Sequence, residues 1–175
     1  MKKLFALALV VLGLAACQTD PSDLNVNFDG TTTVCLTLPE DAITRTGGSD
    51  SAKSGLTNTT GEIVRFIMEI NDENGDKSVH RYVDYADEGT LSVTFPVQLV
   101  PGRDYTFVAW ADMVDAKADV DKYYNTSDLK NITLSDVVEW KAMDEARDAF
   151  TDKYFVDNYS GASTIELNLK RPFAK

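Results

Sequence analysis

The sequence predicts an all-β protein with a minor helical part, built as a β-sandwich. Three observations support this prediction: short segments alternate apolar and polar residues, turn-forming residues separate these segments, and few stretches show helical periodicity. No internal repeat is visible, so we expect one domain over residues 31–175. The segments with strand character are residues 31–38, 62–85, 91–97, 104–111 and 163–170.

The first strand is expected over residues 31–38. Its apolar residues share one face: Val34, Leu36 and Leu38. Cys35 falls on the opposite face and is interpreted as a small side chain within a sheet rather than a reactive thiol. Residues 39–61 are rich in Gly, Ser, Thr and Asp, which predicts a long polar loop.

Residues 62–85 predict a β-hairpin. The apolar residues of its first arm alternate with other residues: Val64, Phe66, Met68 and Ile70. Asn74-Gly75 follows at the turn, where this pair supplies the positive φ angles of tight hairpins. An EF-hand calcium loop over residues 71–76 is excluded, because it would need an acid where Ile70 stands and a Glu six residues after Gly75.

The remaining strands are less regular. Pro96 places the strand at residues 91–97 at a sheet edge or a bulge, because proline has no N–H to donate. After the aromatic-rich strand at residues 104–111 the alternation stops, and residues 112–161 are interpreted as a long, partly helical insertion. Its best helical stretch is residues 135–150. The strand at residues 163–170 then places three apolar residues on one face: Ile165, Leu167 and Leu169.

Both ends of the chain carry signals of their own. Lys2 and Lys3, an apolar run over residues 4–12 and small residues before Cys17 are typical of a secretory signal, so we expect residues 1–16 to be removed. Residues 17–30 are polar and are interpreted as a flexible tether. Residues 171–175 resemble the entry to another strand, so we expect a domain truncated at its C-terminus, whose missing strands a longer product or a partner chain would supply.

Charge and residue counts restrict the function classes. The chain has 17 basic and 28 acidic residues; without Lys2 and Lys3 the net charge is −13, which disfavours nucleic acid as a partner. With Cys17 modified, Cys35 is the only thiol, and His80 is the only histidine. The sequence also lacks a GxSxG motif and a phosphate-binding loop. We therefore expect a non-enzymatic protein with no cofactor and no metal.

Residues 14–17, Leu-Ala-Ala-Cys, resemble the lipobox of bacterial lipoproteins. The resemblance implies that the Cys17 thiol is diacylated, that the signal is cut before it, and that the new amino group is acylated. Two or more acyl chains give stable anchoring where one does not.

Residues 99–115, 123–134, 144–150 and 167–175 are similar to fimbrillin-like lipoproteins of Bacteroidota. That resemblance implies a transthyretin-like β-sandwich that acts in adhesion as a fimbrial stalk, tip, anchor or accessory subunit. It also implies lipidation at the outer membrane, with the domain exposed at the cell surface. Family subunits join by strand exchange after a protease cuts behind an arginine in the loop that follows the first strand. Arg45 stands at the matching position, where the alternative is a solvated loop arginine. The chain departs from the family pattern by lacking the usual second domain and C-terminal donor segment.

Other residues leave alternatives open. Asp50-Ser51-Ala52 resembles a short O-glycosylation acceptor, with Ser51 as the modified residue. Tyr123, Tyr124 and Trp140 are candidates for a glycan-binding platform, which would make the chain a surface glycan-binding lipoprotein; the alternative is core packing. Four acids are candidates for calcium ligands or are simply solvated: Asp112, Asp115, Asp119 and Asp121.

Overall fold

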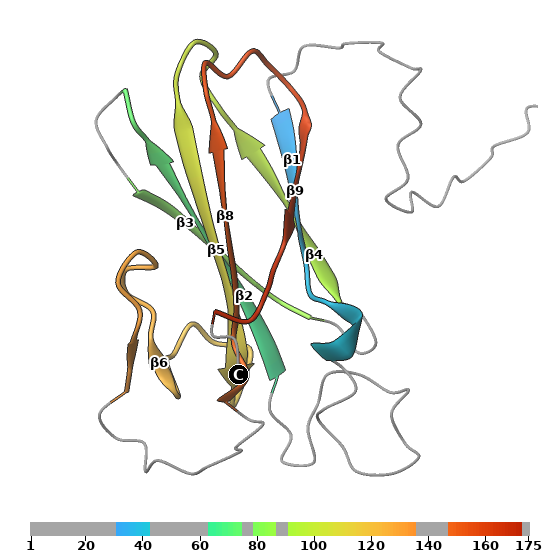
Figure 1. Ribbon diagram of the computed structural model, residues 1–175, viewed down its shortest axis with the longest axis vertical. Coiled ribbons are helices and arrows are strands. Elements are labelled where there is room, and N and C mark those ends of the chain that lie inside the picture. The colour runs from blue at the N-terminus through green and yellow to red at the C-terminus, as the bar shows by residue number, and fades with distance from the viewer. Residues whose placement is uncertain (1–30, 43–62, 75–78, 87–90, 136–146, 173–175) are drawn as a thin grey trace, which may run out of the picture.

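The computed structural model describes residues 31–42, 63–74, 79–86, 91–135 and 147–172 (Figure 1). Nearly all regular structure in these ranges is β-strand. The elements are β1 (Thr31–Thr37), the 3-10 helix η1 (Glu40–Ala42), β2 (Ile63–Asp72), β3 (Val79–Tyr85), β4 (Ser92–Gln98), β5 (Tyr105–Val114), β6 (Tyr124–Asn125), β7 (Thr133–Leu134), β8 (Phe150–Val156) and β9 (Thr164–Asn168).

The described strands form an all-β sandwich, as the sequence predicts. One sheet has three strands in the order β4-β1-β9, and the sheet facing it has four in the order β3-β2-β5-β8. Neighbours pair antiparallel except β1 and β9, which are parallel. A third, two-stranded sheet of β6 and β7 lies beside the four-stranded sheet (Figure 1).

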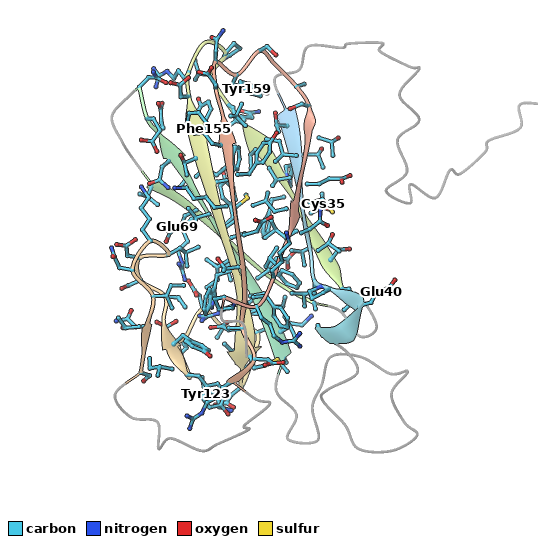
Figure 2. The ribbon with its side chains drawn as sticks, viewed as in Figure 1. Cys35, Glu40, Glu69, Tyr123, Phe155 and Tyr159 are labelled. Carbon is cyan, nitrogen blue, oxygen red and sulfur yellow. The ribbon has the colours of Figure 1, made fainter. Side chains whose placement is uncertain are left out.

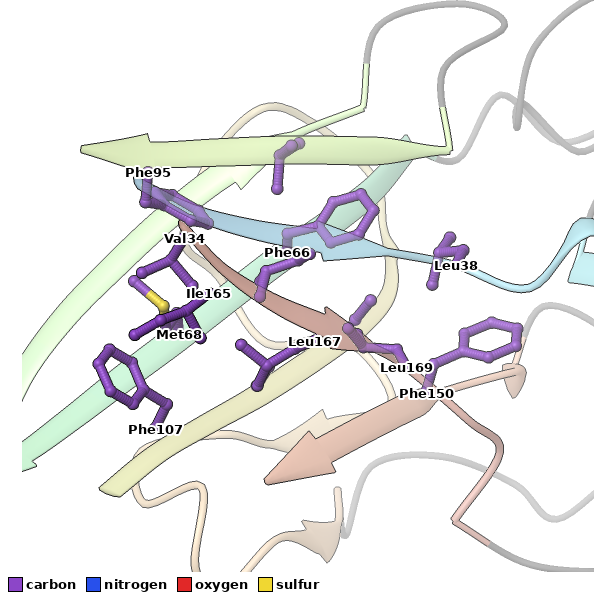
Figure 3. Close-up of a cluster of buried hydrophobic side chains, with 14 of the residues drawn as sticks. Val34, Leu38, Phe66, Met68, Phe95, Phe107, Phe150, Ile165, Leu167 and Leu169 are labelled. Atoms are coloured by element: carbon purple, nitrogen blue, oxygen red, sulfur yellow. The ribbon is translucent and has the colours of Figure 1, made fainter. Parts of the chain in front are cut away.

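The main core lies between the two large sheets (Figure 3). Alternation along each strand directs every second side chain inward, and most of these side chains are apolar. Each large side chain that leaves water in this way contributes about 1.5–3 kcal/mol. The rings of Tyr82 on β3 and Phe95 on β4 meet at 6.0 Å between centroids across one side of the sandwich. The labelled core residues are Val34, Leu38, Phe66, Met68, Phe95, Phe107, Phe150, Ile165, Leu167 and Leu169.

Several expectations for individual strands are confirmed. β1 buries Val34 and Leu36, and the Cys35 side chain is also buried within the sheet. β2 and β3 form the predicted hairpin, although Gly75 of its turn lies outside the described residues. Pro96 belongs to β4, an edge strand of the three-stranded sheet.

The interpretation of residues 112–161 as a partly helical insertion requires correction. β5 continues to Val114, and residues 150–156 form β8, a full strand of the four-stranded sheet. The sequence of β8 hides its character, because Asp152 and Lys153 interrupt its aromatic residues and pairing with β5 decides its conformation. Residues 136–146, most of the stretch considered for a helix, lie outside the described residues.

The two large sheets are joined at one corner. Thr151 of β8 donates its N–H to the Lys170 carbonyl at 2.8 Å, and Lys170 donates its N–H to the Thr151 carbonyl at 2.9 Å. Lys170 lies two residues after the end of β9, so the chain passes here from the three-stranded sheet to the edge of the four-stranded sheet. From this corner β8 and β9 separate toward the opposite end of the sandwich (Figure 1).

The turn between β4 and β5 depends on a glycine. Gly102 has φ of +82°, in the left-handed region, and its N–H donates to the Tyr159 carbonyl at 2.8 Å. A Cβ there would contact no neighbouring atom, so only the backbone conformation opposes a side chain. We expect Gly102→Ala to reduce the free energy of unfolding by about 1–2 kcal/mol in urea titrations. Gly102→Asn should cost less, because asparagine tolerates this conformation; equal losses would contradict the explanation.

Candidate functional site

A buried arginine lies on the outer face of the four-stranded sheet. The Arg65 side chain on β2 is 0% exposed, and its strand partner on β5 is Asp112, whose side chain is 1% exposed. Arg65 donates from Nε to Asp112 Oδ1 at 3.0 Å and from Nη2 to Oδ2 at 2.8 Å. This paired geometry is the strongest form of arginine–carboxylate contact.

The chain that follows β5 adds two further carboxylates to Arg65. Asp119 Oδ1 accepts from Nη1 at 2.9 Å, and Asp121 Oδ1 accepts from Nη2 at 3.0 Å. Asp121 also accepts from the N–H of Thr126 at 2.9 Å and from its hydroxyl at 2.6 Å. Arg65 therefore fastens residues 115–126 against the outer face of the sheet.

Arg81 on β3 extends the network. It donates to both carboxylate oxygens of Asp119 at 3.0 and 3.1 Å and to the Thr126 carbonyl at 2.8 Å. It also contacts Glu69, which is buried and accepts the N–H of Leu129 at 3.2 Å. Two arginines and four carboxylates thus hold residues 115–135, the covering segment, on β2, β3 and β5.

The electrostatics follow from burial and pairing. Burial raises the pKa of Asp112, and Arg65 only partly offsets this increase. The hydrogen bond from Arg81 lowers the pKa of Asp119. For Asp121, burial acts to raise the pKa, but the bonds from Thr126 and Arg65 outweigh it, so the pKa is lowered. Burial likewise opposes the charge of Arg65, yet its aspartates raise the pKa above the ordinary value.

This network corrects the reading of three of the four aspartates as calcium ligands or solvated loop acids, whereas Asp115 fits the solvated alternative. Asp112, Asp119 and Asp121 converge on a guanidinium, which already supplies the positive charge. Asp115 is exposed and pairs with Lys122 at 2.5 Å. Among the residues in the described ranges, no group of three or more His, Cys, Asp or Glu side chains is arranged to hold a metal ion.

The two candidate platform tyrosines pack against different clusters. Tyr123, at the lower end of the molecule in Figure 2, packs on the main core, with Lys122 Nζ 4.8 Å from its ring centroid. Tyr124 packs with Trp110 in a second apolar cluster on the outer face, edge to face at 5.2 Å. Its hydroxyl donates to the Arg147 carbonyl at 2.5 Å. These two rings therefore do not share one face, which fits the core-packing alternative.

Four sequence candidates lie outside the described residues: Cys17, Arg45, Ser51 and Trp140. The described part contains no helix long and apolar enough to cross a membrane. His80 lines a cleft of about 520 Å³ between β3 and β4, beside Tyr82, Gln98 and Arg103.

Residues of β9 leave one sheet edge unpaired in the described part of the chain. Leu169 donates its N–H to the Thr37 carbonyl at 2.9 Å, and the Ser163 carbonyl accepts the N–H of Thr33 at 3.0 Å, so the odd-numbered residues bond to β1. Lys170 faces the other way, toward Thr151. Because main-chain groups alternate along a strand, the groups directed away from β1 belong to three residues: Thr164, Glu166 and Asn168.

The opposite edge of the same sheet is β4. The Leu38 N–H bonds to the Leu91 carbonyl, so the odd-numbered residues of β4 also face β1 and the even-numbered residues face outward. Pro96 is one of these outward residues, and it has no N–H to offer a further strand. Of the two edges, β9 is thus the better equipped for pairing.

Sequence reasoning missed both the arginine network and the open edge. A charged residue inside each of two apolar strands, Arg65 and Asp112, is the signal that could have indicated a buried pair. The open edge of β9 had no signal in the local sequence, because it depends on which strands become neighbours in the sheet.

Together, the fold and its edges define a β-sandwich of three strands against four, with unpaired main chain at β9. The chain belongs to the DUF6562 family, a family of unknown function, whose profile matches residues 22–175. The searches of curated proteins and of solved structures gave no match.

Proposed function

We propose that this protein is a lipid-anchored, non-enzymatic structural protein of the outer cell surface that joins other subunits by strand pairing. In this proposal acylated Cys17 provides the anchor, and the partners are fimbrial subunits of the fimbrillin-like kind. The main support is the open main-chain edge of β9, because an added strand gains a row of hydrogen bonds at such an edge. The lipobox-like sequence before Cys17 supports the anchor.

The position of β1 bears on processing at Arg45. β1 is the middle strand of the three-stranded sheet, and its inward side chains are fully buried at Val34 and Leu36. A cut after Arg45 would separate β1 from β2 in the covalent chain and leave it held only by its neighbours β4 and β9. Loss of β1 would then open a slot in the middle of the sheet for a partner strand.

The test is the intact mass of the protein purified from its native envelope. We expect a chain that begins at Cys17 and carries acyl chains, and we expect Cys17→Ser to abolish incorporation of a labelled fatty acid. A mass that begins at Thr46 would instead identify Arg45 as a processing site, and Arg45→Gln should then restore the longer chain. An unacylated chain that retains residues 1–16 would contradict the anchor.

A further inference from the structure

The mismatch between the sheets leaves part of a strand uncovered. Phe107 on β5 and Tyr154 on β8 are paired residues and therefore lie on the same, inward face of the four-stranded sheet. Phe107 is 0% exposed, because the three-stranded sheet covers it, whereas Tyr154 is 47% exposed. A fourth strand beside β9 would extend the smaller sheet over β8 and cover Tyr154.

The main chain of β9 is ready to bind such a strand. The N–H and carbonyl groups of Thr164, Glu166 and Asn168 point away from β1, and no strand in the described ranges pairs with them. Unpaired backbone at a sheet edge is a template for another strand. Near the joined corner this edge is already used, because Lys170 bonds to Thr151, so the open part lies toward Thr164.

The chain itself contains a segment suited to this edge. Residues 24–28, Leu-Asn-Val-Asn-Phe, alternate apolar and polar side chains and carry no charge. Such a segment fits a strand with one face on a core and one face in water. The segment lies within residues 22–175, the range that the family profile matches.

A chain has little room to place this segment on its own β9. Phe28 and Thr31 are three Cα steps apart, a reach of at most about 10–11 Å. A strand beyond β9 lies two strand spacings from β1, about 9.5 Å. A connection of this length would have to be almost fully extended, and it would have to pass Tyr159 and Ser163, which bond to Thr32 and Thr33 at this end of β1. A neighbouring chain has no such limit.

We propose that residues 24–28 of a second copy of this chain pair with the outer edge of β9 and cover Tyr154. The apolar side chains of the segment would face inward onto Tyr154, and its two asparagines would face water. This inference rests on the strand pairing of the proposed function and names the donor, the acceptor edge and the partner. Each chain has both a donor and an acceptor, so association proceeds from copy to copy.

The test uses one variant defective as donor and one defective as acceptor, both in the full-length protein in detergent. Val26→Asp places a charge on the apolar face of the donor. Glu166→Pro removes an outward N–H that β1 does not use, so β9 should still form. Matched controls are Asn27→Asp, on the polar face of the donor, and Glu166→Gln, which keeps the N–H.

Light scattering after size exclusion should give the unmodified protein and both controls a mass at least twice that of one chain. Each defective variant alone should be monomeric. An equal mixture of the two should form a dimer, because one chain retains the donor and the other retains the acceptor. If Glu166→Pro fails to fold by circular dichroism, Tyr154→Lys serves as the acceptor variant, since this exposed residue is dispensable for the core.

A monomeric unmodified protein, or a mixture that stays monomeric, would overturn the proposal. Both single variants could instead lose stability and not regain it when they are mixed. This result would show that each chain pairs residues 24–28 with its own β9, which also overturns the proposal. These outcomes are independent of the acyl mass at Cys17. A monomeric but acylated protein would therefore reject the copy-to-copy contact and leave the anchor intact.

Discussion

Arg65→Met is expected to lower the free energy of unfolding by about 3–5 kcal/mol, a large part of the stability of a domain of this size. The substitution removes the partner of Asp112 and leaves that carboxylate buried without a counter-charge. It also releases Asp119 and Asp121, which fasten the covering segment. Urea titration followed by tryptophan fluorescence measures the loss.

Two variants separate this explanation from a general loss of packing. Arg65→Met combined with Asp112→Leu removes both buried charges and should recover much of the lost stability. Lys122→Met breaks the pair with Asp115, which is mostly exposed, and should cost under about 1 kcal/mol. A double variant no more stable than Arg65→Met would argue against the unpaired carboxylate as the cause.

The pH dependence gives a further check on the same variant. Burial holds the pKa of Asp112 above its ordinary value even beside Arg65, and without Arg65 the pKa should rise further. A raised carboxyl pKa means that protonation favours the folded state, so the deficit of Arg65→Met should shrink as pH falls through that pKa. Asp119 behaves oppositely, because the hydrogen bond from Arg81 lowers its pKa. Its contribution to the free energy of unfolding is therefore fully present above the ordinary carboxyl pKa and is lost as pH falls through the lowered pKa.

Trp110→Ala is expected to cost about 3–5 kcal/mol and to loosen the segment that covers the outer face. Trp110 is buried in the second apolar cluster with Ile67, Val108 and Leu129, and its ring contacts Tyr124 edge to face. Its removal leaves a cavity beneath β6 and β7. Limited proteolysis should then cut within residues 115–135 faster than in the unmodified protein, and urea titration should show the loss of stability.

Phe155→Ala is the matched control, because Phe155 also lies on the outer face of the four-stranded sheet. It is 53% exposed near the far end of β8 (Figure 2), beyond the covering segment. Its removal should change the stability by less than about 1 kcal/mol and leave the proteolysis pattern unchanged. Similar effects of the two substitutions would mean that the outer cluster is not a second core.

The sequence determined the strands whose two faces differ. β4 and β9 alternate between buried apolar and exposed residues, and β1 directs Val34 and Leu36 inward; that period was sufficient to locate each strand and its inward face. The same alternation, together with Asn74-Gly75 at the turn, predicted the hairpin of β2 and β3. These features depend on neighbours along the chain, which is why one sequence reveals them.

Tertiary structure alone decided what lies on the outer face of the four-stranded sheet. β2 and β5 are buried on both faces, so neither Arg65 nor Asp112 could be recognised as buried until residues 115–135 were seen to cover them. β8 was missed for a related reason: as an edge strand it is exposed in part on both faces and shows no clean period. Its conformation is set by the ladder to β5.

The arrangement of edges also required the folded chain. Pro96 indicated from the sequence that β4 lies at an edge, but no residue of β9 indicated that three strands would face four and leave Tyr154 exposed. Strand order depends on pairings between residues far apart in the chain, for which local pattern carries no information. The sequence by itself thus determined the sandwich and most of its strands, and only the tertiary structure decided its buried charges and its open edge.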